Sequence, residues 1–212
     1  MLSLKGKGVC GGVTLGTLAV LQREAAAVKR RKVLDAEAEV TRFQAARQEA
    51  IAKLAVLYEK AVVDVGRDNA AIFEIHQMML EDLDYIESIE GIIRTQHVNA
   101  EYAVQTTAAN FAEIFSSMED DYMRARAADV KDISRKVLDC LGDGGSSWES
   151  GEGSYILAAD DLAPSETVQL DKARVQGFVT AAGSVNSHTA ILARTIGIPA
   201  VVSTGSSIGE EY

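Results

Sequence analysis

The residues best suited to chemistry lie in the segment 182–205, AGSVNSHTAILARTIGIPAVVSTG. Its pattern predicts a glycine turn, a short helix beginning at or just after His188, a stop at Gly197 and then an apolar strand. His188 would therefore stand at a helix amino terminus. Unpaired backbone N–H groups and the positive end of the helix dipole favour phosphate oxygens at such a position.

A histidine in this setting can act as a nucleophile towards phosphorus, because its pKa near neutrality leaves much of the imidazole unprotonated. The product would be a phosphoramidate. Ser187 and Thr189 would place hydroxyl donors beside the same oxygens, and Gly183 would let the preceding backbone come close. On residue type and setting alone, a histidine in such a turn is more often a cap or a hydrogen-bonded core residue than a catalytic group.

Alternating strand and helix patterns surround this segment and predict an α/β domain. Strand patterns occur at 8–21, 154–158, 176–180 and 200–203, and helical patterns at 164–170 and 188–195. The first strand lies at the amino end of the chain and the others at the carboxyl end. A domain formed by both ends of the chain, with another domain inserted between them, is therefore expected.

The middle of the chain is rich in Ala, Glu, Arg and Lys and predicts a helical bundle with short connections. The predicted helices start near 35 and run to Gly66, from Asp68 to 80, from Asp82 to 96, from Asn99 to 118 and from Asp121 to 141. Gly142, Gly144 and Gly145 would stop the last of them. His97 falls in a junction and is read as a loop or cap residue without a chemical role.

The segment around His188 resembles the phosphohistidine signature of the family that includes Enzyme I of the bacterial sugar phosphotransferase system, pyruvate phosphate dikinase and phosphoenolpyruvate synthase. The matching residues are Gly183, Ser187, His188, Thr189, Ala193, Arg194, Pro199 and Ala200. Residues 71–89 (AIFEIHQMMLEDLDYIESI) and 120–138 (DDYMRARAADVKDISRKVL) resemble Enzyme I specifically. The loop 159–167 also matches, and its Thr167 corresponds to a threonine that approaches the active histidine.

The resemblance implies a swivelling α/β phosphohistidine domain, residues 1–32 and 143–212, with an inserted all-α helical-bundle subdomain, residues 33–142. It implies that His188 accepts a phosphoryl group from phosphoenolpyruvate and passes it to a histidine of the carrier protein HPr. Phosphoenolpyruvate and Mg²⁺ would bind a carboxy-terminal barrel that this chain lacks, so the chain would hold no metal or cofactor and perform only the HPr exchange. The α/β domain of the family continues beyond this point, which predicts a truncated chain.

The helical subdomain of Enzyme I is the docking platform for HPr, and the resemblance assigns this role to the corresponding residues here. The predicted contacts are His76, Met78, Met79, Glu81, Asp82 and Arg126. An apolar patch with an acidic rim would suit a basic, partly apolar partner. The alternative is that the methionines form the bundle core and the acids a solvated face.

Some residues depart from the Enzyme I pattern. Ser184 stands where the second glycine of a pair is usual, Gly11 and Gly12 replace a common Ser-Pro, and Asn69 replaces a frequent lysine. Two other functions therefore stay open. One is the mobile phosphohistidine domain of a dikinase or synthase, and the other is a non-enzymatic interaction module with a vestigial α/β domain.

Composition excludes several classes of protein. The net charge of −10 disfavours nucleic acid and anionic membranes and favours a basic protein partner. No apolar run is long enough to cross a bilayer, and no signal peptide is recognised, so a cytoplasmic location is expected. Cys10 and Cys140 form neither a metal motif nor a disulfide framework and are expected to be structural.

Overall fold

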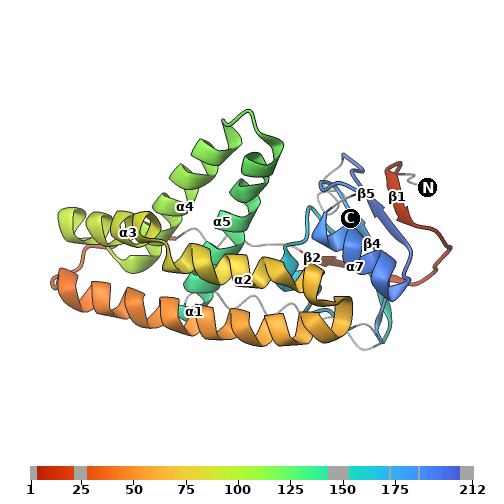
Figure 1. Cartoon of the computed structure of the whole chain (residues 1–212), viewed down its shortest axis with the longest axis horizontal. Helices are drawn as coiled ribbons and strands as arrows, with labels where there is room; N and C mark the ends of the chain where they lie inside the picture. Colours follow the sequence, from red (N-terminus) through yellow and green to blue (C-terminus); the bar gives the residue numbers. More distant parts are fainter. Residues whose placement is uncertain (1–3, 22–27, 143–152, 172, 186, 206–212) are drawn as a thin grey trace. The chain divides into compact units, whose positions relative to one another are not determined.

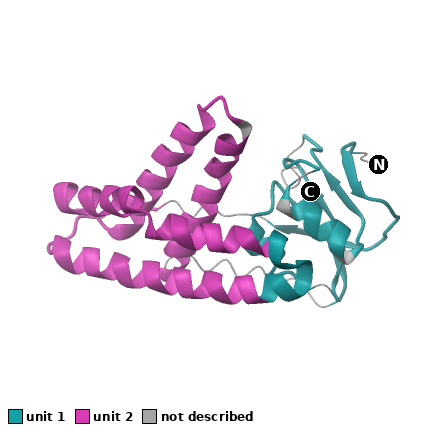
Figure 2. Cartoon of the chain, in the orientation of Figure 1, with its two compact units in different colours: residues 1–24, 60–69, 147–212 teal, residues 25–59, 70–146 magenta. Residues whose placement is uncertain are grey.

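The computed structural model describes residues 4–21, 28–142, 153–171, 173–185 and 187–205. The chain divides into two compact units (Figures 1 and 2). An α/β unit comprises residues 1–24, 60–69 and 147–212, and a helical unit comprises residues 25–59 and 70–146. This division differs from the predicted boundaries mainly at residues 60–69, which group with the α/β unit although they belong to long helices.

The α/β unit is built on a five-stranded sheet, as far as the described residues go. Its strands are β1 (Lys7–Cys10), β2 (Thr17–Leu21), β3 (Tyr155–Ala159), β4 (Val175–Thr180) and β5 (Ala200–Val202), in the order β1-β5-β4-β3-β2. Strands β2 to β5 are parallel neighbours, and β1 runs antiparallel to β5. The carboxyl ends of the parallel strands therefore meet at one edge of the sheet.

The prediction of one strand over residues 8–21 is wrong, because β1 and β2 lie at opposite edges of the sheet. The segment that joins them passes close to β4 and to the residue before β5. A Cβ at Gly177 would lie 2.9 Å from the Thr14 side chain and 3.0 Å from the Pro199 carbonyl oxygen, and one at Gly12 would lie 2.8 Å from the Pro199 ring. Glycine at both positions makes this close crossing possible.

Two short helices follow the central strands, α6 (Pro164–Thr167) after β3 and α7 (His188–Ile196) after β4. The first ends earlier than the predicted 164–170, whereas the second matches its prediction closely. Leu157, Phe178 and Ala193 belong to one buried apolar cluster that unites sheet and helices. This core fixes the position of α7 against the strands.

The helical unit holds five helices among its described residues, and two of them, α1 and α2, share residues 60–69 with the α/β unit. They are α1 (Ala36–Val65), α2 (Arg67–Glu81), α3 (Leu83–Gln96), α4 (Ala100–Ser116) and α5 (Asp121–Cys140). Gly66, with φ +83°, separates α1 from α2. Asp35 caps α1, since its Oδ1 accepts from the backbone N–H groups of Glu37 and Ala38.

The helix starts confirm some predicted caps and correct others. Asp82 caps α3 by accepting from the Tyr85 N–H, as predicted. In contrast, α2 already begins at Arg67, so Asp68 lies inside its first turn, and α5 is capped by Asp120 rather than Asp121. His97 ends α3 in the left-handed conformation, with φ 50°, which confirms it as a cap residue.

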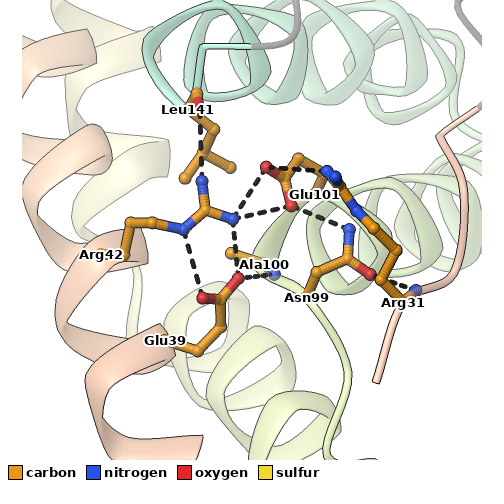
Figure 3. A network of polar contacts seen from close by, with 7 residues as sticks. All are labelled: Arg31, Glu39, Arg42, Asn99, Ala100, Glu101 and Leu141. Carbon is orange, nitrogen blue, oxygen red and sulfur yellow. Dashed lines mark hydrogen bonds and ion pairs between the residues drawn. The ribbon is translucent and has the colours of Figure 1, made fainter. Parts of the chain in front are cut away.

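Asn99 occupies the cap position of α4 but its side chain is used elsewhere, in a polar network around the buried carboxylate of Glu101 (Figure 3). Glu101 accepts from Arg42 Nη2 at 2.8 Å with both oxygens and from Asn99 Nδ2 at 2.8 Å. The Asn99 side chain in turn accepts from the Arg31 backbone N–H at 2.8 Å. The network thus ties α4 to α1 and to the segment before α1.

Arg42 extends this network to two further parts of the unit. It donates to both carboxylate oxygens of Glu39, at 2.7 and 3.2 Å, and to the Leu141 carbonyl oxygen at 3.2 Å, beyond the end of α5. Burial alone would raise the pKa of Glu101, but the hydrogen bonds from Arg42 and Asn99 outweigh it and hold that pKa below the ordinary value of a glutamate. Glu101 therefore stays ionised at neutral pH and stabilises the fold in that form.

We predict that Arg42→Met destabilises the protein by about 2–4 kcal/mol, because it leaves the buried Glu101 carboxylate without its main counter-charge. Urea unfolding followed by circular dichroism measures the effect. Lys53→Met is the matched control on the same helix, since its ion pair with Glu49 is half exposed and is worth less than about 1 kcal/mol. Equal losses for the two variants would contradict the structural role of the network.

We also predict that the difference in unfolding free energy between the wild type and Glu101→Gln becomes smaller as the pH is lowered into the acid range. Because the folded-state pKa of Glu101 is lowered, its ionic contribution is present above the ordinary pKa of a glutamate and is lost as pH falls through the lowered folded-state pKa. The two unfolding free energies should therefore converge in acid. A difference that stays constant from pH 7 to pH 3 would refute the assignment.

Candidate functional site

Helix α7 begins at His188, the residue expected to carry the phosphoryl group. Ser187 is the N-cap, with φ −65° and ψ 159°, and its Oγ accepts from the Ala190 N–H at 3.2 Å. The imidazole of His188 lies outside the described side chains, as does the whole of Asn186. The structure does describe the start of helix α7, and the backbone N–H groups of its first turn favour a bound anion.

Backbone hydrogen bonds fix the loop that leads into α7. Ala182 donates to the Asp160 carbonyl oxygen at 2.7 Å, and Ser203 and Gly205 donate to the carbonyls of Ala182 and Ala181 at 3.3 and 3.0 Å. The loop is therefore held between the segment after β3 and the segment after β5. It lies at the carboxyl edge of the parallel strands, where α/β folds place ligands.

Side chains strengthen the same loop at both ends. Ser203 Oγ donates to the Gly183 carbonyl oxygen at 2.6 Å, and Thr180 Oγ1 donates to the Ala182 carbonyl oxygen at 2.7 Å. From the last turns of α7, the Arg194 guanidinium donates back to the Val185 carbonyl oxygen. The loop and the helix it precedes thus form one hydrogen-bonded unit.

Gly183 needs its residue type, because its φ of +91° is a conformation that side chains disfavour. A Cβ there would lie 3.4 Å from Asp161 Oδ1, 3.6 Å from Thr180 Oγ1 and 3.9 Å from Ser187 Oγ. Gly183 therefore faces a cluster of oxygen atoms. Ser184, the departure from a glycine pair, has no positive φ, so its backbone conformation does not require glycine.

Two predicted site residues, Thr189 and Thr167, use their hydroxyl hydrogens within the protein. Thr189 is buried and donates its hydroxyl to the Leu162 carbonyl oxygen at 3.0 Å. Its predicted role as a donor to phosphoryl oxygens is therefore corrected to that of an anchor between α7 and the loop before α6. Thr167 is also buried and donates to the Pro164 carbonyl oxygen at 2.8 Å.

The predicted docking residues lie at the end of α2, at the α2–α3 junction and on α5. Met78 is 68% exposed, and Glu81 and Asp82 are exposed, whereas Met79 is half buried. Exposed side chains that the sequence analysis did not single out lie on nearby chain positions: Leu83 at the start of α3 and Tyr122 at the start of α5. Their exposure could not be read from residue type.

His76 requires a correction, because its side chain is completely buried and cannot touch a partner in this structure. Its Nε2 lies 3.3 Å from Asp129 Oδ1 and its Nδ1 lies 3.7 Å from Asp132 Oδ2. The Arg126 side chain is mostly buried, with 13% exposed; it binds Asp129 Oδ2 at 3.2 Å and lies over the Tyr122 ring at 4.5 Å from its centre. Asp129 and Tyr122 were missed, although Arg126 is three residues from one and four from the other, the spacings of neighbours on a helix.

Asn69 donates its side-chain amide to the Val65 carbonyl oxygen at 2.9 Å, across the α1–α2 break. In the part of the chain that the structure describes, no group of three or more His, Cys, Asp or Glu residues could hold a metal ion. The described helices also include none long and apolar enough to span a membrane.

Comparisons with known proteins agree with this architecture. The family model described as "PEP-utilising enzyme, N-terminal" matches residues 5–126, and the one described as "PEP-utilising enzyme, mobile domain" matches residues 151–210. Curated relatives carry the name phosphoenolpyruvate-protein phosphotransferase. That of Bacillus sp. (strain S) is 37% identical over 209 residues, and that of Listeria monocytogenes is 39% identical over 202 residues.

The chain covers little more than a third of these relatives. The matches include 98% and 95% of this chain but only 36% and 35% of the two relatives. Their names say that phosphoenolpyruvate and a protein are the substrates of those enzymes.

Two solved structures resemble the chain over most of its length. The solution structure of an Enzyme I protein is 32% identical, has a TM-score of 0.75 and is matched over 96% of this chain and 84% of its own. The N-terminal domain of Enzyme 1 - Nitrogen is 26% identical, with a TM-score of 0.65 and coverage of 94% and 83%. The chain therefore belongs to the PEP-utilising enzymes and, within them, to the Enzyme I proteins.

Proposed function

We propose that this chain is the phosphohistidine and carrier-docking part of a phosphoenolpyruvate-protein phosphotransferase. In this proposal His188 accepts the phosphoryl group and passes it to a histidine of the carrier protein HPr. The site that binds phosphoenolpyruvate and Mg²⁺ would lie in the two thirds of the relatives that this chain does not span. The names of the curated relatives favour this function over that of a dikinase.

The observation that carries the proposal is the fixed loop before α7. Ser187 caps the helix at the residue that precedes His188, and Gly183 and Ala182 are held by Ser203 and Asp160. A phosphoryl group on His188 would meet the N–H groups of the first turn, which stabilise anionic oxygens without any side-chain movement. Ser187 can contribute its hydroxyl hydrogen as well, because in capping α7 its oxygen acts as an acceptor.

Each of the two phosphoryl transfers forms one bond to phosphorus and breaks another. In the first, a ring nitrogen of His188 attacks phosphorus, an N–P bond forms, the P–O bond of phosphoenolpyruvate breaks, and the enolate of pyruvate leaves and takes up a proton. In the second, an imidazole nitrogen of HPr attacks the same phosphorus and the N–P bond to His188 breaks. Positioning and charge neutralisation dominate such transfers, because the loose transition state needs little covalent help.

Thr167, the threonine expected to approach the active histidine, fits a supporting role as a hydrogen-bond acceptor. Its hydroxyl hydrogen is directed to the Pro164 carbonyl, so its oxygen is left to accept a hydrogen bond. Helices α6 and α7 are in contact. We infer that Thr167 Oγ1 accepts from the imidazole N–H of His188 and so fixes the tautomer whose other nitrogen attacks phosphorus.

The helical unit supplies the docking surface in this proposal. Met78, Leu83 and Tyr122 are large exposed apolar or aromatic side chains, and Glu81 and Asp82 add negative charge beside the first two. Aromatic residues, methionine and arginine are typical of interface centres, and acidic residues attract a basic partner. A basic, partly apolar face of HPr would complement this surface.

We predict that His188→Ala abolishes acid-labile labelling of the chain by phospho-HPr, because no ring nitrogen is left to accept the group. Labelled phosphate transferred from phospho-HPr is followed by electrophoresis. His97→Asn is the matched control, since asparagine tolerates the left-handed conformation that His97 adopts at the end of α3. Labelling that persists in His188→Ala, or that vanishes in His97→Asn with the fold intact, would contradict the proposal.

We further predict that Thr167→Val slows phosphoryl exchange with HPr by about tenfold or more, whereas Thr167→Ser stays close to the wild type. Valine keeps the shape of threonine but removes the acceptor oxygen, a loss of about 1.4 kcal/mol or more for a hydrogen bond in the transition state. Rapid-quench measurement of the exchange gives the rates. If valine and serine behave alike, Thr167 has no part in the reaction.

A further inference from the structure

The buried imidazole of His76 links two helices of the docking surface. It belongs to α2 and lies against α5, where it is opposite two aspartates one turn apart. Asp129 Oδ1 is 3.3 Å from Nε2, a hydrogen-bond distance, and Asp132 Oδ2 is 3.7 Å from Nδ1. Phe73 packs edge-on against the same ring, with centroids 6.2 Å apart. The imidazole is thus closed in by apolar and carboxylate groups.

Asp129 divides its two oxygens between the interior and the surface. Its Oδ1 faces His76, and its Oδ2 accepts from Arg126 Nη1 at 3.2 Å. A carboxylate bound on both sides cannot turn about its side-chain torsions without losing one partner. His76 therefore determines where Asp129 presents Oδ2 to Arg126.

Arg126 is held on its other side by Tyr122. The guanidinium carbon lies 4.5 Å from the centre of the ring, and Nη2 contacts the tyrosine hydroxyl. Tyr122 itself is 64% exposed. A continuous path of polar contacts thus runs from the buried His76, through Asp129 and Arg126, to an exposed aromatic ring.

We propose that His76 is a positioning residue for docking: through Asp129 it holds the Arg126 guanidinium in the orientation that a partner protein binds. The part that concerns HPr rests on the proposed function above. Holding the side chain in advance removes the entropy that a free arginine would lose on binding. His76 therefore contributes to affinity without reaching the surface.

The test compares three variants of the full chain. His76→Leu removes the ring nitrogens, His76→Gln keeps an N–H donor at a similar distance from the backbone, and Tyr85→Phe is the control. Tyr85 makes a buried hydrogen bond of 2.8 Å between α3 and Ser134 of α5, and it is not a member of the polar path from His76 to Arg126. The control therefore loses a buried polar link to α5 of the same kind without disturbing the path to Arg126.

Guanidinium nitrogen NMR gives the first readout and needs no partner. In the wild type we expect a distinct, slowly rotating Arg126 guanidinium, which His76→Leu converts to the averaged signal of a free arginine. His76→Gln should retain most of the wild-type signal, and Tyr85→Phe all of it. An unchanged Arg126 signal in His76→Leu overturns the proposal, even if HPr does not bind at all.

Calorimetric titration with HPr gives the second readout. We expect His76→Leu to weaken binding about tenfold and Tyr85→Phe to leave it unchanged. In an Arg126→Met background, His76→Leu should cause no further loss, because the group that it positions is absent. A loss of equal size in both backgrounds shows a general structural effect and overturns the proposal. Absence of binding by the wild type would instead contradict the proposed function, while the NMR result still decides the role of His76.

Discussion

A buried carboxylate, that of Glu101, holds together parts of the helical unit that are far apart in sequence. Arg42 binds it from α1, Asn99 from the start of α4, and Arg42 also reaches the Leu141 carbonyl beyond α5 (Figure 3). The segment before α1 is linked to the same network, because the backbone N–H of Arg31 donates to the Asn99 side chain. The segment before α1 and the residue after α5 are therefore both held by the network around the Glu101 carboxylate. Leaving this buried carboxylate without a partner would destabilise the fold.

The candidate site in the α/β unit is organised by hydrogen bonds to the backbone of its loop, from both backbone and side-chain donors. The loop before α7 receives its hydrogen bonds from the segments after β3 and β5, so that its conformation follows from the parallel sheet. This explains why Ser184 can replace a glycine, whereas Gly183 cannot be replaced without strain. In the first turn of α7, the Ser187 cap and the Thr189 hydroxyl fix the helix start, the latter by donating to the Leu162 carbonyl oxygen.

The proposed docking surface is organised in the opposite way, because buried side chains determine how its exposed residues are oriented. His76 and Asp129 are buried, yet they fix an arginine whose neighbour Tyr122 is exposed. Burying polar groups is tolerated only where they are paired, and here the pairing joins α2 to α5. The surface that a partner would meet is thus specified partly by residues that it never contacts.

The sequence by itself determined most of the sites of helix and strand, because their signals are local: the 3.6-residue periodicity of α1, the Asp82 cap, and the Ser187–Gly197 limits of α7. It also placed His188 at a helix start and identified the family motif. Only the tertiary structure decided that residues 8–21 form two strands on opposite edges, that Thr189 binds Leu162, and that His76 lies in the interior. These features arise from contacts between residues distant along the chain, and no local pattern of residue types encodes them.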